Sequence, residues 1–360
     1  MTAACEFVTA SRMQAVREAL RASGRIGIDT EFARETTYYP RLCLVQIAAA
    51  ENVFCADPLA GENLAAFWDA ILNCSWVIHA ARQDIEVVYL VSGRMPREIF
   101  DTQVAAGLVG YAPQLGYAAL VAELFGAELP KAHTRADWSQ RPLPPELLEY
   151  AVEDVQYLLP AYERLGARLD ELGRLQWALE DSRDLLDETL YAANPEGAVL
   201  RLKGTGRLSG RARAAAAALA EWREREALAR DRPRQWILKD ATIVEIATLD
   251  PEDRAALYRV PGLPAKTVRR AGKDLLGLLA EARRAALPDE PPPRADEAAL
   301  RARLKPMQAA VAKVAAELDI APEVIASRKE RLAALAGERG LRVFRGWRRE
   351  VVGEALLALA

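Results

Sequence analysis

Two acidic residues at alternate positions end a strand pattern near the start of the chain. Residues 25–32 read Arg-Ile-Gly-Ile-Asp-Thr-Glu-Phe, so a β-branched run closes on Asp29 and Glu31. Because alternate side chains of a strand point to the same face, both carboxylates should leave the sheet together. The fold must therefore accommodate two like charges side by side at the end of a strand.

Three further residues extend this pair into a candidate site. Asp84 ends residues 76–84, an apolar strand that passes into a helix, and it falls near the first turn of that helix. Tyr150 and Asp154 are four residues apart in a helical pattern over 147–155 and so share one face. Four carboxylates packed together would repel one another and take up protons, whereas Mg²⁺ or Mn²⁺ would remove the conflict.

Each acid also has an ordinary structural interpretation when it is taken alone. Asp29 can be a turn residue at a strand end, Asp84 a charge at a helix start, and Asp154 a solvated helix residue. The joint pattern favours a metal site. Tyr150 is unsuited to be a strong base, because a free phenol has a pKa of about 10, and we expect it to orient a water molecule.

The order and spacing of these residues resemble a known family. The chain carries, in sequence, Asp29-x-Glu31, then His79 with Asp84 five residues later, then Tyr150-x-x-x-Asp154. This series is similar to the three exonuclease motifs of the DEDD superfamily in its tyrosine subclass. The flanking segments 37–42, 101–103, 134–138 and 155–160 extend the resemblance, which covers nearly the whole chain.

The resemblance implies a fold, a reaction and residue roles. The fold would be an α/β ribonuclease H-like exonuclease domain with a mixed sheet. Asp29, Glu31 and Asp154 would hold the ion that activates water, Asp29 would bridge to a second ion, and Asp84 would hold that second ion. The expected activity is 3′–5′ exoribonuclease action that releases nucleoside 5′-monophosphates, with transfer RNA precursors as the substrate that members of the superfamily trim.

Two alternatives remain open at this stage. A DNA 3′–5′ exonuclease would carry the same catalytic motifs, because the motifs do not read the sugar. A non-catalytic RNA-binding scaffold could also keep the fold, although every motif acid is present. His79 is expected to be a hydrogen-bonded structural histidine, so we leave it out of the candidate site.

Alternating patterns predict the elements of the first part of the chain. We expect helices over 11–21, 64–72, 84–91, 115–125 and 146–190 in segments, and strands over 26–31, 42–48, 53–56, 76–79 and near 99. Short connections among the first three strands favour antiparallel pairing, and the later strand–helix alternation favours parallel additions. The acids would then lie around one edge of this sheet.

The rest of the chain reads as helical domains. Turn signals at 194–206 place a boundary there, so we expect an exonuclease domain over 1–195. Residues 207–286 resemble the HRDC domain, a helical module of RecQ-type helicases, and a proline-rich linker at 287–293 ends it. Residues 295–360 resemble a second HRDC-like domain.

The net charge of −3 conceals an uneven distribution. Residues 1–195 hold 16 Lys and Arg against 28 Asp and Glu, a net charge of −12, whereas residues 196–360 hold 32 against 23, a net charge of +9. The basic half suits the phosphate backbone of RNA, with an ordinary solvated surface as the alternative. Phe32 is a candidate for base stacking, with Tyr38 and Tyr39 as weaker ones, and Lys131 and Arg135 are candidates for phosphate contact.

The N-terminal segment and the lack of long apolar runs indicate where the protein is expected to be located. The segment around Glu6 is polar where a signal peptide would be apolar, and no long apolar run follows, so we expect a cytoplasmic protein without a membrane partner. No obligate protein partner is inferred.

The four cysteines, Cys5, Cys43, Cys55 and Cys74, have no paired spacing and are expected to be reduced, which makes a zinc cluster improbable.

Overall fold

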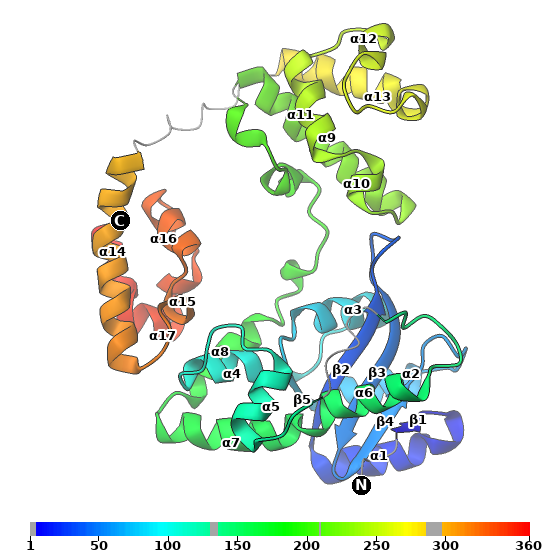
Figure 1. The fold of residues 1–360 in the computed structure, drawn as a ribbon, viewed down its shortest axis with the longest axis vertical. Coiled ribbons are helices and arrows are strands. Elements are labelled where there is room, and N and C mark those ends of the chain that lie inside the picture. The colour runs from blue at the N-terminus through cyan, green and yellow to red at the C-terminus, as the bar shows by residue number, and fades with distance from the viewer. Residues whose placement is uncertain (1–4, 130–135, 209, 286–296) are drawn as a thin grey trace. The chain divides into compact units, whose positions relative to one another are not determined.

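The computed structural model describes residues 5–129, 136–208, 210–285 and 297–360 (Figure 1). It divides into two compact units. Unit 1 contains Met1–Ala33, Leu42–Tyr191 and Glu297–Ala360, and unit 2 contains Arg34–Arg41 and Ala192–Asp296. The domain boundaries expected from the sequence stay a prediction, although this division groups residues 297–360 with the amino-terminal region.

A six-stranded mixed sheet forms the centre of unit 1. Its strands are β1 (Cys5–Phe7), β2 (Arg25–Ala33), β3 (Arg41–Ala49), β4 (Asn52–Ala56), β5 (Ser75–Ile78) and β6 (Glu98–Asp101). They lie in the order β1-β4-β3-β2-β5-β6. Strand β4 pairs antiparallel with β3, and β5 pairs parallel with both β2 and β6, as the sequence predicts. Strand β1, which pairs parallel with β4, was not expected.

Successive side chains of β2 point alternately to the two faces of the sheet. Ile26 and Ile28 are fully buried in one core, together with residues of α1 (Met13–Ser23), α2 (Ala65–Leu72) and α3 (Arg82–Ser92). The alternate residues, Gly27 and Asp29, therefore face the opposite side of the sheet. Helix α6 (Pro145–Gln156) lies across β2, β4 and β1 on that side (Figure 1).

Further helices complete the amino-terminal region of unit 1. They are α4 (Thr102–Leu108), α5 (Tyr117–Phe125), α7 (Leu158–Glu171) and α8 (Leu175–Asp184). The sequence did not predict α4 or the break between α6 and α7 at Tyr157. Helix α8 ends at Asp184, and only the short 3₁₀ turn Glu188–Leu190 follows where a longer helix was expected.

The last 64 residues of unit 1, Glu297–Ala360, pack against α8 and share its core. They form α14 (Glu297–Leu318), α15 (Pro322–Ile325), α16 (Arg328–Leu335), α17 (Gly346–Arg348) and α18 (Glu354–Leu359). Trp347 stacks on Trp177 of α8 with ring centroids 4.5 Å apart. Buried Arg348 forms a two-pronged ion pair with Asp181, also on α8. These contacts fix the C-terminal helices to the amino-terminal region of unit 1.

Unit 2 is helical apart from Arg34–Arg41, which connects β2 to β3. Its helices are α9 (Gly210–Arg230), α10 (Arg234–Ile237), α11 (Asp240–Leu249), α12 (Arg254–Tyr258) and α13 (Ala265–Arg284). Within this unit, the Tyr38 hydroxyl donates to buried Glu224 at 2.6 Å, and the backbone N–H groups of Tyr38 and Tyr39 donate to Asp231. Tyr38 thus makes structural contacts within unit 2, and its base-stacking role stays a prediction.

The cysteine prediction is correct for two residues and wrong for two. Cys43 and Cys74 are free thiols. Cys5 and Cys55 form a disulfide, because the unexpected strand β1 lies beside β4 and brings residues 50 positions apart together. Among the helices of the described residues, none combines the length and the apolar character needed to cross a membrane.

Candidate active site

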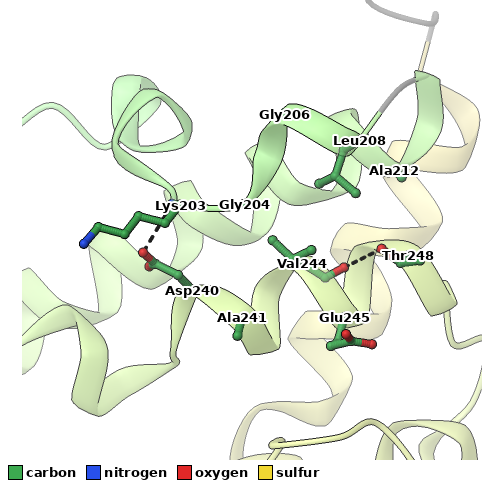
Figure 2. A pocket seen from close by; sticks show the side chains of 10 residues that line it. All are labelled: Lys203, Gly204, Gly206, Leu208, Ala212, Asp240, Ala241, Val244, Glu245 and Thr248. Atoms are coloured by element: carbon green, nitrogen blue, oxygen red, sulfur yellow. Dashed lines mark hydrogen bonds between the residues drawn. The ribbon is translucent and has the colours of Figure 1, made fainter.

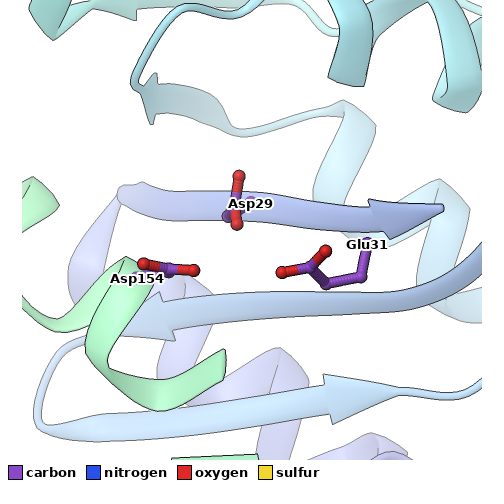
Figure 3. A group of neighbouring side chains, drawn as sticks. All are labelled: Asp29, Glu31 and Asp154. Carbon is purple, nitrogen blue, oxygen red and sulfur yellow. The ribbon is translucent and has the colours of Figure 1, made fainter. Parts of the chain in front are cut away.

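Three of the predicted carboxylates meet beside the second half of β2. Asp29, Glu31 and Asp154 each offer an oxygen atom, and these atoms all lie within 4.8 Å of one another. Figure 3 shows the group, with Asp154 contributed by α6. Asp29, Tyr150 and Asp154 also line a small cavity of about 170 Å³. The fold thus brings together three acids that the sequence singles out in two separate motifs.

A close approach between α6 and β2 brings Asp154 to the strand. A Cβ atom added to Gly27 would lie 3.0 Å from Cβ of Leu158 and 3.2 Å from the carbonyl oxygen of Val155. A side chain at this position would crowd both atoms, so glycine allows the α6–α7 junction to pack closely on the backbone of β2. Pro144 and Pro145 start α6, where proline is tolerated because the first N–H groups have no helical partner.

Asp84 lies beside the group of three. It is in the first turn of α3, is 7% exposed, and accepts a hydrogen bond of 2.5 Å from the Thr30 hydroxyl. Thr30 points to the face opposite its neighbours Asp29 and Glu31, so Asp84 approaches β2 from the other side. Asp101 holds the turn before α3, because its carboxylate accepts from the N–H groups of Ala80 and Ala81.

Burial and mutual repulsion oppose ionisation of all four acids. Burial raises the pKa of Glu31 to about 9, and the charges of Asp154 and Asp84 add to the effect. Burial likewise raises the pKa of Asp84 and of Asp154 to about 7 each. The pKa of Asp29 is held well above its ordinary value by burial first and then by Asp84, Asp154 and Glu31. These shifts are expected when like charges share a buried site without compensation.

The surroundings of the acids fit a hard divalent cation. Among the ion pairs between described residues, none joins a Lys or an Arg to one of the four acids. Gln46 of β3 is fully buried and donates a long hydrogen bond of 3.5 Å to Asp29, while its own Oε1 has no partner among the described residues. Several oxygen ligands without a protein cation match the preference of Mg²⁺ and Mn²⁺.

Tyr150 adds a phenol to the carboxylates. It hydrogen-bonds to Asp154, one turn further along α6, and burial together with the charge of Asp154 raises its pKa above the ordinary value. The hydroxyl therefore stays protonated and cannot act as a base at neutral pH. Its single O–H is directed to Asp154 in this structure, and the water-orienting role expected from the sequence stays a prediction.

Other predicted residues have different outcomes. Phe32 is half-buried and packs against the core on one face of the sheet, so its base-stacking role stays a prediction. Lys131 and Arg135 lie outside the described residues. His79 is hydrogen-bonded at both ring nitrogens, to Thr102 and to the carbonyl of Leu115, which agrees with a structural role. Burial lowers its pKa.

Sequence reasoning missed several residues of the site. Gln46 sits in a continuous apolar strand, and Thr30 is an unremarkable residue between two acids. The polar amide of Gln46 within apolar β3 was the one signal in the sequence, because a buried amide needs partners. Asp101 and Tyr117 act through contacts with segments far along the chain, which sequence periodicity does not reveal.

A larger hollow of about 950 Å³ lies within unit 2 and has a different character. Figure 2 shows its lining by the 203–208 turn and by α11, with Asp240 and Glu245 as its acids. Asp240 is already bound to Arg223 at 2.6 Å and to Gln235 at 2.8 Å. Apolar residues such as Leu208 and Val244 line the rest. This hollow gathers no catalytic group comparable to the one around Asp29.

Comparisons with known proteins agree with this site. A family model described as a 3′-5′ exonuclease matches residues 6–170, and one described as the HRDC domain matches residues 212–279. The ribonuclease D of Gluconacetobacter diazotrophicus is 40% identical over 368 residues, which cover 98% of this chain and 92% of that protein. The ribonuclease D of Acidiphilium cryptum is 40% identical over 362 residues, 98% of this chain and 91% of that protein.

A solved structure extends the likeness to the whole fold. The crystal structure of Escherichia coli RNase D, an exoribonuclease involved in structured RNA processing, matches with a TM-score of 0.89 and 31% identity. The match covers 100% of this chain and 98% of that chain. The expected fold class, a mixed-sheet exonuclease domain followed by helical parts, is thereby confirmed. With close relatives along nearly its full length, the chain belongs to the ribonuclease D family of 3′–5′ exoribonucleases.

Proposed function

We propose that this exoribonuclease hydrolyses the terminal phosphodiester of RNA with two divalent cations, Mg²⁺ or Mn²⁺, and releases nucleoside 5′-monophosphates. Asp29, Glu31, Asp84 and Asp154 would hold the ions. The observation that carries the proposal is the half-buried group formed by Asp29, Glu31 and Asp154, whose carboxylate oxygens lie within 4.8 Å of one another beside β2. Their raised pKa values mark a charge conflict that a bound cation would relieve.

The chemistry follows from the residues around the group. A pair of such ions stabilises both the entering and the leaving oxygen of an in-line displacement at phosphorus. Tyr150 would orient the attacking water through its protonated hydroxyl. Water adds to phosphorus as the 3′ oxygen of the preceding nucleotide leaves, so the products are a nucleoside 5′-monophosphate and a new 3′-hydroxyl. The proton lost by the attacking water passes to solvent, and the leaving 3′ oxygen takes up a proton from solvent to become the new 3′-hydroxyl.

The proposed substrate follows from the family of the chain and from the excess of basic residues in its second half. We propose RNA with a free 3′ end, and transfer RNA precursors in particular, as the substrate in the cytoplasm. An exposed basic face on α13 supports a role of unit 2 in holding RNA. This basic face consists of Lys266, Arg269, Arg270 and Lys273, at spacings that put all four on one side of the helix. Within the described ranges, none of the four forms an ion pair.

The direct test is hydrolysis of single-stranded RNA labelled at its 3′ end, beside DNA of the same sequence, with Mg²⁺ and with a chelator. We expect labelled mononucleotide from RNA only when Mg²⁺ is present. Equal rates on DNA would favour the DNA exonuclease alternative, and activity in chelator would contradict the metal assignment. Binding of RNA without hydrolysis under every condition would favour the scaffold.

A further inference from the structure

The Tyr117 hydroxyl is inserted into the junction between α6 and α7. It donates a hydrogen bond of 3.3 Å to the carbonyl of Glu153 and accepts one of 3.2 Å from the N–H of Tyr157. In a continuous helix, the N–H of Tyr157 would donate to the carbonyl of Glu153 four residues earlier. The phenol thus takes the place of one helical hydrogen bond, and a side chain inserted in this way kinks a helix.

This junction carries the last carboxylate of the site. Asp154 directly follows Glu153, and α6 ends only two residues later, at Gln156. On the strand side, Leu158 and Val155 press against Gly27. The junction is therefore held between the backbone of β2 and the Tyr117 hydroxyl, and a change in either support would move Asp154 relative to Asp29 and Glu31.

Tyr117 is itself fixed by the second motif. Its ring lies 5.6 Å from the ring of His79, measured between centroids, and both residues line the small cavity of the site. His79 donates from Nε2 to the carbonyl of Leu115, two residues before Tyr117, and its Nδ1 shares a hydrogen bond with the Thr102 hydroxyl. The second motif thus supports the third through the start of α5.

We propose that Tyr117 is a positioning residue for metal binding, which holds the α6–α7 break so that Asp154 can share a cation with Asp29 and Glu31. The inference rests on the proposed metal site. It predicts that loss of the hydroxyl weakens metal binding, whereas loss of the Tyr150 hydroxyl lowers turnover and leaves metal affinity nearly intact. Residues that orient metal ligands typically change metal affinity about 10-fold to 100-fold when they are replaced.

The experiment compares Tyr117→Phe with the parent, with Tyr150→Phe and with Tyr162→Phe. Tyr162 is a matched control, because it is a half-buried tyrosine of α7 whose ring packs on Phe100. Mn²⁺ affinity is measured without RNA, by calorimetry and by the rise in melting temperature with added Mn²⁺. Hydrolysis of a short RNA is then followed against Mn²⁺ concentration and against RNA concentration.

For Tyr117→Phe we expect the Mn²⁺ midpoint to rise about 10-fold, with KM for RNA unchanged and kcat largely recovered at saturating Mn²⁺. Tyr162→Phe should match the parent. A folded Tyr117→Phe protein with the parental Mn²⁺ midpoint would overturn the inference, even if its melting temperature is lower. Gly27→Ala, which crowds the same junction from the strand side, should raise the midpoint as well and provides a second test.

Asp154→Asn separates this inference from the proposal on which it rests. If Asp154→Asn keeps parental Mn²⁺ affinity, the metal assignment itself fails. If Asp154→Asn loses Mn²⁺ affinity while Tyr117→Phe and Gly27→Ala both keep it, the metal site stands and only the positioning role is lost.

Discussion

Two half-buried carboxylates in the two units have opposite environments. Glu31 lies in unit 1 among other acids, and its pKa is raised to about 9, chiefly by burial and then by neighbouring charges. Asp240 lies in unit 2, where burial also acts to raise its pKa, but hydrogen bonds from Arg223 and Gln235 outweigh burial and lower it. The charge of Asp240 is thus compensated by neighbouring groups in unit 2, whereas the charge of Glu31 in unit 1 is opposed by neighbouring acids.

The difference indicates which group of acids needs a cation from outside the chain. The charge of Asp240 is compensated within the unit by Arg223, whose Nη1 donates both to Asp240 and to the carbonyl of Leu238, while its Nε has no partner among the described residues. A buried pair of this kind is disrupted when one partner is removed, since the other is left uncompensated. The acids around Asp29 behave in the reverse way, because removal of one acid relieves repulsion. Substitution of one charged residue can therefore distinguish the two cases, because it should destabilise the fold at a structural pair and should not do so at the acid group.

The largest expected effect comes from matched neutralisations in the two units. Asp154→Asn should reduce RNA hydrolysis on the order of 10³-fold or more, because a metal-binding carboxylate is lost, while melting without metal stays unchanged or rises. Asp240→Asn should lower the free energy of unfolding by roughly 3 kcal/mol and leave kcat on a short RNA near the parental value. Steady-state hydrolysis and chemical unfolding measure both. Near-parental activity of Asp154→Asn would remove the basis of the comparison.

The pH dependence of stability gives an intermediate effect. A carboxyl group whose pKa is raised on folding destabilises the folded protein when it ionises. For Glu31 this loss of stability develops as the pH rises from the ordinary pKa of 4.5 to the raised pKa of about 9. We expect the metal-free protein to melt at progressively lower temperature between about pH 5 and pH 9, and saturating Mg²⁺ to flatten this decline.

Two variants serve as controls for this pH effect. Glu31→Gln should reduce the decline, because the ionising group is gone. Asp240→Asn should keep it, because the pKa of Asp240 is lowered and its contribution changes only below its ordinary value of 3.8. A melting temperature independent of pH in the metal-free protein would contradict the charge conflict at the site.

The smallest expected effect concerns RNA holding by unit 2. Arg269→Gln with Arg270→Gln should weaken binding of structured RNA and flatten the slope of log K against log salt by about 0.7 for each phosphate that the variant no longer binds. The control changes net charge equally but removes cations already paired on α9, namely Arg225→Gln with Arg230→Gln. RNA affinity at several salt concentrations measures the slopes. Equal slopes for both double variants would mean that the basic face is only a solvated surface.

Local sequence patterns were sufficient for most of the elements, but not for β1 or α4, and for selecting acids that the structure brings close together. Period-two alternation in residues 25–32 places Asp29 and Glu31 on one face of β2, and a spacing of four places Tyr150 and Asp154 on one face of α6. These relations depend only on backbone geometry within one element. The sequence could therefore determine them, and the family resemblance added the order in which the motifs meet.

Contacts between distant segments were decided only by the tertiary structure. Nothing in the local pattern indicates that the Tyr117 hydroxyl enters the helix at Tyr157, 40 residues later, or that Cys5 lies beside Cys55. Gly27 looks like a weak strand residue until the close approach of Leu158 gives the reason for it. Raised pKa values likewise arise only when separate acids are buried together, because desolvation and repulsion depend on distances that the linear sequence does not contain.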